Sequence, residues 1–541
     1  MLNFIDQIGE WNPQLFRELK GRLKKSHVAI ALFISLAPQL FILLLQFESN
    51  QNKEKYLNFW QPEEWRMVFI SFNMIFIFTL LVGGTYLIIN DLVKEERDGT
   101  LNFIRLSPQS ELSIFTGKML GVPVLIHLMI ITAIPFHLFA GISANIPFSY
   151  ILYFYLTLVA SCILFYSFAS LFAIFRDTDF KVSKPWFASG AILIFLTISA
   201  SWEHFNIHYY YAWVRMFSPM EMNNYLFSGL LNEHNSSGFY NLSFLNLPLG
   251  KNAVSFLALY LVNYVLAIYW VWQGLIRCFR NPNATLLGKR QSYLLVATFN
   301  FVHLGFLMHG NLTNQQDFIT EIIYLYIWNL LLFLALLGAI LPHRQAIQDW
   351  ATFRLQKKPS DRVLLKNSLL SELVLDEKSP GALAIAINLL IAASFVVLLI
   401  LMKGKAYEYK GISLSFIVTI CIIFFISLIM IYASIAQIML MAKNSKRNSL
   451  ATGTTATAIA LPILIGSISS ISISSTDHVD STLWLFTVVF PYGFVDTTAI
   501  KVFSVFICQL AILGLLNWHL IKQVKSLGES ATKVIFSQVK V

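Results

Sequence analysis

Long apolar runs of about twenty residues alternate with short polar or charged segments along the whole chain. An α-helix of that length crosses the hydrocarbon core of a bilayer, and a helix satisfies its own backbone hydrogen bonds inside lipid. The pattern therefore predicts an all-α polytopic membrane protein with about twelve transmembrane helices. We expect the spans at residues 28–47, 67–89, 119–140, 147–174, 185–202, 253–276, 293–309, 319–341, 381–402, 412–441, 451–473 and 498–521.

The distribution of basic residues predicts the orientation of these spans. An even number of spans places both termini on one side, and 30 of the 39 lysines and arginines lie on that side, against nine on the other. Basic residues are enriched in cytosolic loops, so we expect both termini in the cytosol. The net charge of +10 is explained by this topology and does not indicate a nucleic-acid partner.

Composition agrees with the pattern and excludes an ordinary soluble protein. Hydrophobic residues make up 56% of the chain and charged residues 13%, far from the average of a soluble domain. The four cysteines lie in or beside apolar stretches and lack the spacing of metal ligands, so we expect no metal site. They are Cys162, Cys278, Cys421 and Cys508.

The loop between the second and third spans is the most informative stretch of the chain. A charge cluster at Lys94–Asp98 is followed by an apolar-spaced segment from Leu101 to Leu106. Ser107 and Pro108 then form the pattern of a helix N-cap with proline in the first turn. We therefore predict a structured cytosolic helical hairpin over residues 90–118.

The N-terminal residues 1–26 predict an amphipathic helix at the membrane interface. Trp11, Leu15, Leu19 and Leu23 recur every fourth residue, while most of the basic residues lie off that stripe. Asn12-Pro13 supplies a cap and a first-turn proline. A basic helix with one apolar face lies in the interface and does not cross the membrane.

Two ordered motifs resemble a known family. Glu95-Glu96-Arg97-Asp98-Gly99-Thr100, then Leu106-Ser107-Pro108, then Gly117-Lys118 resemble the signature of the type-2 class of ATP-binding-cassette exporter permeases. Trp11 followed by Asn12-Pro13 and Arg17-Glu18 resembles the elbow before the first span of such permeases. The resemblance is close from Asn90 to Gly121 and looser over the rest of the first half.

This resemblance implies a function and a partner. In the family, the 90–118 segment is a coupling helix that docks on a separate ATPase subunit, and two copies of that subunit are usual. The chain would be the membrane-spanning permease of an exporter in the cytoplasmic (inner) membrane. It would not be an enzyme and would bind no cofactor of its own. One chain for the whole membrane portion and a homodimer both remain open.

The sequence itself contains no phosphate-binding loop that would let this chain hydrolyse ATP. Gly117-Lys118 is followed by Met119 instead of Ser or Thr, and Leu112 stands where the first glycine of the loop should be. ATP would therefore be hydrolysed by the partner.

The chain divides into two tandem six-span units. We place the boundary at a basic, proline-containing connector, giving a first unit at 27–280 and a more divergent second unit at 281–541. The second unit contains a basic cytosolic segment, 343–380, which is either an ATPase contact or a solvated surface.

An aromatic-rich exterior segment, 203–250, precedes the sixth span. By the resemblance, its short re-entrant helices would cap the outer end of the transport path. The candidate gate residues are Pro219, Met220 and Glu221 there, and Pro491 and Tyr492 in the parallel segment of the second unit.

Three other function classes remain open from the residues alone, and one of them is a non-transporting scaffold that would bind an ATPase but move no substrate. An ion- or proton-coupled carrier usually keeps ionisable groups inside its spans, but His127 and His137 are the main examples here, and we interpret both as neutral packing residues. A lipid-modifying enzyme would need catalytic groups at the interface, and only Glu203, His204, His208 and Glu221 could serve.

The coupling interpretation yields a first prediction. Replacing Glu95, Glu96 and Arg97 together by alanine should leave membrane insertion intact and abolish binding to an ATPase, because the charge cluster leads directly into the docking segment. A detergent pull-down measures this. Retention of the ATPase by the triple variant would refute the assignment.

Overall fold

The computed structural model describes residues 9–51, 61–175, 184–200, 211–231, 239–308, 315–356, 369–403, 407–409, 411–444, 446–472, 481–494 and 497–538. These residues are almost entirely helical, apart from a two-stranded antiparallel pair of two-residue strands, β1 (Glu408–Tyr409) and β2 (Ile412–Ser413). The predicted all-α class is confirmed. The chain forms two compact units, unit 1 (Met1–Pro282 with Gly305–His309) and unit 2 (Asn283–Leu304 with Gly310–Val541).

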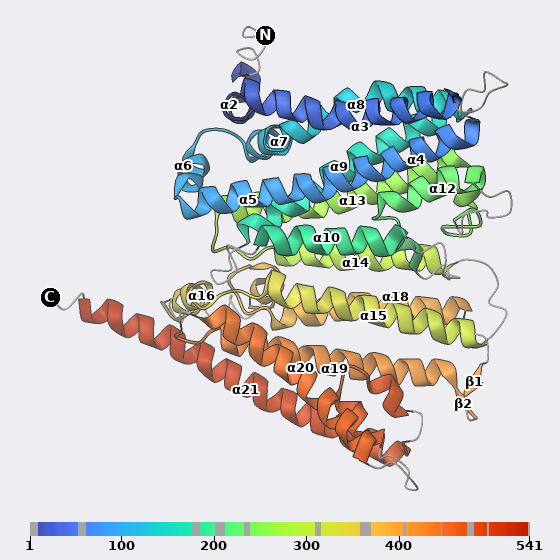
Figure 1. The fold of residues 1–541 in the computed structure, drawn as a ribbon. Coiled ribbons are helices and arrows are strands. Elements are labelled where there is room, and N and C mark those ends of the chain that lie inside the picture. The colour runs from blue at the N-terminus through green and yellow to red at the C-terminus, as the bar shows by residue number, and fades with distance from the viewer. Residues whose placement is uncertain are drawn as a thin grey trace. The chain divides into compact units, whose positions relative to one another are not determined.

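Unit 1 is a bundle of long helices that lie side by side (Figure 1). The short helices α2, α6 and α7 lie at one end of this bundle and α12 at the other. Its elements are α2 (Pro13–Arg22), α3 (Lys25–Gln51), α4 (Pro62–Phe78), the π turn η1 (Thr79–Gly83), α5 (Gly84–Arg97), α6 (Thr100–Leu106), α7 (Glu111–Gly121), α8 (Val124–Ser143), α9 (Phe148–Ile174), α10 (Lys184–Ala200), α11 (Ala212–Arg215), α12 (Pro219–Leu231), the 3-10 turn η4 (Leu249–Lys251) and α13 (Ala253–Arg280).

Local sequence sets the helix starts in unit 1. The Asn12 side chain accepts a hydrogen bond from the Leu15 N–H, with Pro13 in the first turn, as predicted. Gln61, Pro62 and Glu64 form a capping box with a first-turn proline at the start of α4. Pro123, which cannot donate a backbone hydrogen bond, separates α7 from α8.

The core beneath the predicted hairpin gathers apolar side chains from α5, α6, α7, α9 and α13. Fully or almost fully buried members include Ile88, Leu92, Leu101, Phe115 and Phe279. Burial of such side chains stabilises each by about 1.5–3 kcal/mol. The hairpin is therefore packed on the bundle and is not a free loop.

Unit 2 has its own core, in which α19 is central. Its helices are α14 (Lys289–Leu307, as far as Leu304), α15 (Gln315–Ile340), α16 (Arg344–Gln356), α18 (Ala382–Lys403), α19 (Leu414–Leu440), α20 (Arg447–Ser472) and α21 (Ala499–Gln538), with 3-10 turns η5 (Ser481–Phe486) and η6 (Phe490–Phe494). Buried side chains of α19, including Phe424, Ile429 and Tyr432, pack with Phe333 of α15 and Leu389 of α18.

Ten helices among the described residues are long and apolar enough to cross a membrane, two fewer than the sequence predicted. The other two predicted spans fall on α10 and α14. Helix α10 is apolar but has 17 described residues. Helix α14 carries Lys289, Arg290 and Gln291 in its first turn and Asn300 and His303 further along, which lowers its apolar content.

The second span differs most from its predicted bounds of 67–89. One continuous candidate span runs from Pro62 to Arg97, so Lys94–Arg97 form the last turn of the span helix itself. The third span begins at Val124 and not at Met119, because Pro123 interrupts the helix there.

Candidate functional site

The predicted hairpin consists of α6 and α7, joined to the span helix α5 by a tight turn. Gly99 has a φ of +77°, a left-handed conformation that favours glycine. The Thr100 hydroxyl donates to the Glu95 carbonyl at 3.2 Å across this turn. Leu101 and Ile104 of α6 face the core, which fixes the orientation of this short helix.

The predicted N-cap at Ser107 is wrong. Ser107 ends α6, and its hydroxyl donates to the Ile104 carbonyl at 2.7 Å. Pro108 disfavours the helical conformation of the residue before it, and Ser107 is extended, with ψ of 151°. Ser110 caps α7 instead, because its hydroxyl accepts the Ser113 N–H at 3.2 Å.

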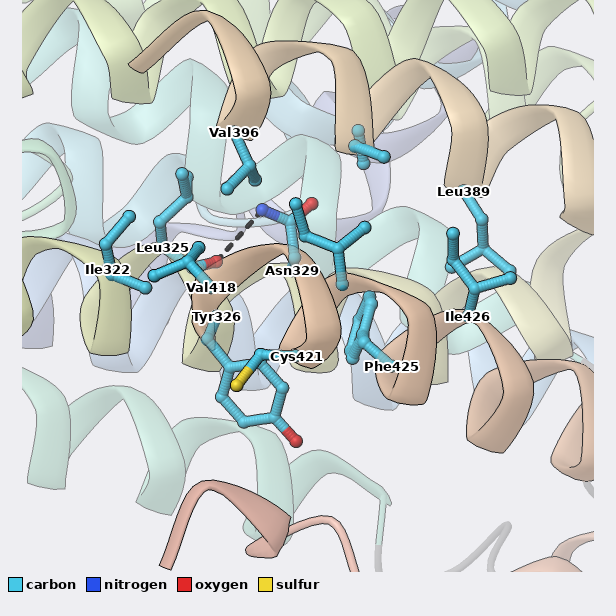
Figure 2. Close-up of a pocket in the computed structure, with 13 residues that line it drawn as sticks. Ile322, Leu325, Tyr326, Asn329, Leu389, Val396, Val418, Cys421, Phe425 and Ile426 are labelled. Atoms are coloured by element: carbon cyan, nitrogen blue, oxygen red, sulfur yellow. Dashed lines mark hydrogen bonds between the residues drawn. The ribbon is translucent and has the colours of Figure 1, made fainter. Parts of the chain in front are cut away.

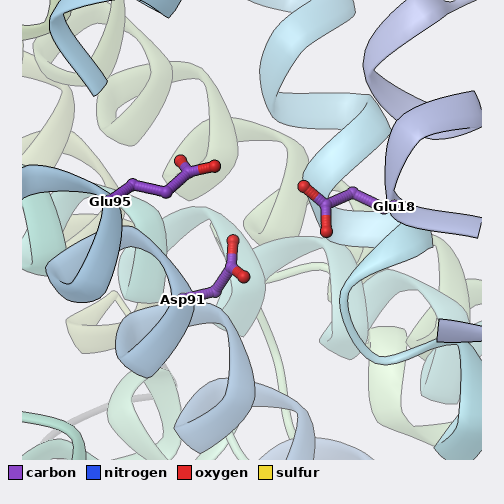
Figure 3. Close-up of side chains that lie close together, drawn as sticks. All are labelled: Glu18, Asp91 and Glu95. Atoms are coloured by element: carbon purple, nitrogen blue, oxygen red, sulfur yellow. The ribbon is translucent and has the colours of Figure 1, made fainter. Parts of the chain in front are cut away.

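Lys118 of α7 is the centre of a buried charge cluster. Its side chain has no exposed surface, and its Nζ lies 2.7 Å from Asp91 Oδ2, 2.8 Å from Glu95 Oε2 and 3.4 Å from Glu18 Oε1. Figure 3 shows these three carboxylates converging, Glu18 from α2 and the other two from α5. They are close enough to one another to hold a cation, and the Lys118 ammonium supplies that charge.

Two arginines of α2 complete the cluster. Arg22 contacts Glu18 Oε2 at 3.3 Å and Asp91 Oδ1 at 2.5 Å. Arg17 contacts Glu18 at 3.0 Å and also pairs with Glu95. Three cations thus face three anions, and α2 is joined to both α5 and α7 by charge-assisted hydrogen bonds.

The pKa values of Lys118 and Glu18 shift in the directions that keep both groups charged. Burial lowers the pKa of Lys118, but Asp91, Glu95 and Glu18 outweigh it, and the pKa is raised above 10.5. Burial likewise raises the pKa of Glu18, but Lys118 and Arg17 outweigh it, so that pKa is lowered below 4.5. The ionised state is therefore the stable one at neutral pH.

Close backbone contact reinforces the charges. The Asn12 Nδ2 donates to the Ser113 carbonyl at 2.8 Å. A Cβ at Gly117 would lie 2.8 Å from Asn12 Oδ1, and one at Gly121 would lie 2.5 Å from the Glu18 Cβ. Only glycines on α7 let α2 approach this closely.

The elbow helix therefore docks through a polar face, which the sequence analysis missed. Its buried side chains are Asn12, Gln14, Leu15 and Glu18, whereas Trp11 is 69% exposed. Pro13 and Arg17 are also exposed. The predicted apolar stripe is split, because Leu15 faces α7 while Trp11 faces outward.

The outer side of the hairpin carries large exposed apolar residues. Phe103 and Leu106 of α6 are 78% and 84% exposed, and Leu112 of α7 is 59% exposed. Arg97, Asp98, Thr100 and Pro108 are also exposed, with Arg97 Nε 3.5 Å from Asp98 Oδ1. Glu96 and Ser107 are half-buried. The predicted coupling residues thus divide into two sets. Glu95 and Lys118 form the inward set, and the outward set contains the exposed residues Arg97, Asp98, Thr100, Leu106 and Pro108.

The start of α7 is tied to the last span of unit 1. Arg280 of α13 pairs with Glu111, and its guanidinium donates to the Gln109 carbonyl at 3.1 Å and the Arg105 carbonyl at 3.3 Å. The hydrogen bond from Arg280 lowers the pKa of Glu111. No local pattern indicates this contact, since 169 residues separate the partners.

Residues 21–200, which contain this hairpin and α3 to α10, match the family model of the ABC-2 family transporter proteins. Over these residues the chain is similar to the membrane proteins of that family. Neither curated proteins nor solved structures gave a match. Permease domains of this family are typically non-catalytic, typically bind no cofactor and generally pair with an ATPase subunit that hydrolyses ATP.

The predicted exterior segment lies beyond the matched residues, and its described part is built around a buried ion pair. Arg215 Nε and Nη2 donate to the two oxygens of Glu221 at 2.9 and 2.6 Å. Pro219 and Met220 are buried beside it. Positions 203–210 and 232–238, with His204 and His208, lie outside the described residues. In unit 2, Pro491 and Tyr492 belong to η6, and Pro491 is half-buried.

A polar network connects this exterior segment to three spans of unit 1. The two ring nitrogens of His137 lie 2.7 Å from the Tyr155 hydroxyl and 2.8 Å from Asn73 Oδ1. The Asn73 amide in turn donates to Asn223 of α12 at 2.8 Å. His137 is fully buried and stacks on Phe69, as a packing residue would.

Unit 2 contains a small cavity between α15, α18 and α19 (Figure 2). Its volume is about 60 Å³, and its wall is largely apolar. Asn329 lies in this wall, and its amide donates to the Leu325 carbonyl and to Asn300 Oδ1, both at 2.9 Å. A cavity that binds a molecule the size of benzene has about 150 Å³. This cavity is therefore too small to hold a benzene-sized molecule.

The charge cluster yields a prediction for Lys118→Met. The change leaves three buried or half-buried carboxylates short of one cation, which should lower the free energy of unfolding of unit 1 by about 3–5 kcal/mol. It should also make α2 more susceptible to cleavage by trypsin. Thermal unfolding in detergent and limited proteolysis measure the two effects.

Lys94→Met is the matched control, because Lys94 is an exposed lysine at the end of α5. It should change stability by about 0.5 kcal/mol or less. Adding Glu18→Gln to Lys118→Met removes one uncompensated carboxylate and should restore part of the loss. Equal effects of the two lysine variants would contradict the proposed role of the cluster.

The same pKa shifts predict how docking of α2 depends on pH. A lowered Glu18 pKa contributes stability that is present above 4.5 and is lost as the pH falls through the folded-state value. A raised Lys118 pKa contributes stability that is present below 10.5 and is lost as the pH rises above it. Hydrogen exchange of α2, corrected for intrinsic rates, should stay slow from about pH 5 to 10 and accelerate outside that window. A flat profile from pH 3 to 7 would count against the cluster.

Proposed function

We propose that the chain is the membrane-spanning permease of an ATP-binding-cassette exporter. It moves a substrate outward across the cytoplasmic (inner) membrane, using ATP hydrolysed by a separate ATPase subunit. The membrane portion consists of twelve spans in two tandem units, 27–280 and 281–541. Ten of these spans are the long apolar helices, and α10 and α14 are the other two. Both termini lie in the cytosol, as the 30-to-9 asymmetry of basic residues supports.

The observation that carries the proposal is the division of the hairpin into two sides. The inward side is fixed by buried charges and packed apolar residues, while the outward side of α6 exposes Phe103 and Leu106 almost completely. Exposed clusters of large apolar side chains mark protein or membrane contacts, and we assign this cluster to the ATPase. We place the ATPase groove on these residues, with Glu96, Arg97, Asp98, Gly99, Thr100, Ser107 and Pro108 around them.

The proposal gives each inward residue a mechanical role. A push on α6 is transmitted through Gly99 to α5 and through α7 to α8, the second and third spans. Glu95 and Lys118 transmit it to the elbow residues Asn12, Arg17 and Glu18, and Arg280 transmits it to α13. The exterior residues Pro219, Met220 and Glu221, with Pro491 and Tyr492 in unit 2, would gate the outer end of the path.

Two ATPase copies are expected for one transporter, so a second contact is needed. In unit 2, the turn between α19 and α20 is only a few residues long. The α16 helix of the basic segment lies close to this turn, where Arg344 donates to the Met441 carbonyl at 2.8 Å. We place the second contact there if one chain supplies the whole membrane portion, and on the Phe103 hairpin of a second copy if the chain is a homodimer.

The decisive experiment is purification of the chain from its native membrane, followed by identification of co-purifying proteins. A protein with a Walker phosphate-binding motif should accompany it. Transport that persists without any nucleotide-hydrolysing partner and collapses with the proton gradient would instead indicate a coupled carrier.

The docking surface yields a sharper prediction. Phe103→Ala combined with Leu106→Ala should reduce ATPase capture by at least about tenfold, because each large apolar side chain contributes about 1.5–3 kcal/mol when buried. Asn102→Asp is the matched control, since it lies on the same exposed face and keeps the apolar surface. Unchanged capture by the double variant would place the ATPase elsewhere.

A further inference from the structure

The helix of the second span contains one π turn. From Pro62 to Arg97 it runs for 36 residues, about 54 Å at 1.5 Å per residue, well beyond the roughly 30 Å of a hydrocarbon core. The π turn η1 at Thr79–Gly83 lies near its middle. Such turns occur mostly as single interruptions of α-helices, frequently at functional sites.

A tyrosine of the fourth span forms a hydrogen bond with this turn. The Gly84 N–H is shared between the carbonyls of Leu80 and Leu81. The hydroxyl of Tyr166, on α9, donates to the Leu80 carbonyl at 3.0 Å. Tyr166 is only 3% exposed, and this side chain satisfies a backbone group that lipid could not.

The lack of a side chain at Gly84 leaves space for the Tyr166 ring. A Cβ at position 84 would lie 2.2 Å from the Tyr166 hydroxyl oxygen and 2.6 Å from two of its ring carbons. No other residue at 84 leaves the tyrosine in its present place. The π turn of the second span and Tyr166 of the fourth span therefore depend on each other.

A buried hydroxyl beside the turn is unused in this state. Thr85 is 1% exposed, and its Oγ1 has no hydrogen-bond partner among the described residues. Helical threonines ordinarily donate to the carbonyl three or four residues earlier, which here includes Leu81. In the observed structure the Thr85 hydroxyl does not make that bond.

Beyond the π turn, α5 continues for 14 residues. Its far end carries Asp91 and Glu95, which hold the elbow and the hairpin through Lys118. A rotation of about 10° at the turn would move that end by about 4 Å, given a length of about 21 Å.

We propose that the π turn at Thr79–Gly83 is a hinge on which α5 moves as a lever, and that Tyr166 and Gly84 are positioning residues that hold it in the observed state. The elbow, α5 and the hairpin then move as one body when the ATPase pushes on α6. This inference rests on the proposed function for its purpose, but its geometry can be tested without any ATPase.

The test is a pair of spin-label distances in the full chain, purified with all four cysteines replaced by serine. One pair joins Lys94→Cys on the lever to Val265→Cys, an exposed position of α13. The other joins Lys94→Cys to Lys20→Cys on the elbow. In Tyr166→Phe, the Lys94–Val265 distance should broaden or shift by about 2–4 Å, while the Lys94–Lys20 distance stays unchanged.

Tyr260→Phe is the matched control, because Tyr260 is a buried tyrosine of unit 1 that donates to the Ser218 carbonyl at 2.6 Å. It should change neither distance. Gly84→Ala, which displaces the Tyr166 ring, should reproduce the effect of Tyr166→Phe and provides a second variant if one fails to fold. Exchange of the amides at 80–86 should accelerate about two- to tenfold in both hinge variants.

Identical Lys94–Val265 distances in the parent and both hinge variants would overturn the proposal. So would equal changes in both label pairs, since these would indicate general loosening and not rotation about one turn. If the lever moves in Tyr166→Phe but no ATPase binds the hairpin, the hinge stands and the proposed function fails.

Discussion

One buried ammonium group joins the parts of this protein that surround the candidate docking surface. Lys118 lies between carboxylates of the elbow and of the second span, at 2.7–3.4 Å from each. An isolated charge in that position would cost several kcal/mol in lost hydration, so the lysine requires the acids and the acids require the lysine. This mutual dependence makes α2, α5 and α7 a single body, although Glu18 and Lys118 are 100 residues apart.

That body allows the hairpin to present an exposed apolar surface. A short helix such as α6, with seven residues, would not be stable alone. It is held by Leu101 and Ile104 beneath it, by Gly99 on one side and by the Arg280 contacts to α7 on the other. Phe103 and Leu106 therefore remain exposed without unfolding the segment, which is the condition for a preformed protein contact.

Each unit uses a buried lysine to hold the segment that precedes a span helix, but the two lysines have different hydrogen-bond partners. In unit 2 the buried Lys289 at the start of α14 donates to the Leu373 and Pro380 carbonyls and to the Ser379 hydroxyl, at 2.6–3.1 Å. It holds the segment that precedes α18, much as Lys118 holds the elbow that precedes α3. Its acceptors are neutral, and burial lowers the pKa of Lys289 to about 8. In unit 1 the carboxylates instead raise the pKa of Lys118.

The sequence by itself determined the all-α membrane class, ten of the spans, the Asn12 cap and the place of the hairpin. Run length, capping chemistry and proline positions are local properties, readable without a partner. The same local reasoning misplaced the cap of α7, because Ser107 and Ser110 both fit a cap and only the backbone before Pro108 decides between them. Glu18–Arg22 and Asp91–Glu95 have the spacing of one helical turn, so the members of each pair lie on one face of a helix, but this spacing does not indicate what that face contacts. Only the tertiary structure decided that these faces meet at Lys118 and that Phe103 and Leu106 are left outside, because helical periodicity fixes neighbours within a helix and not which helix packs against it.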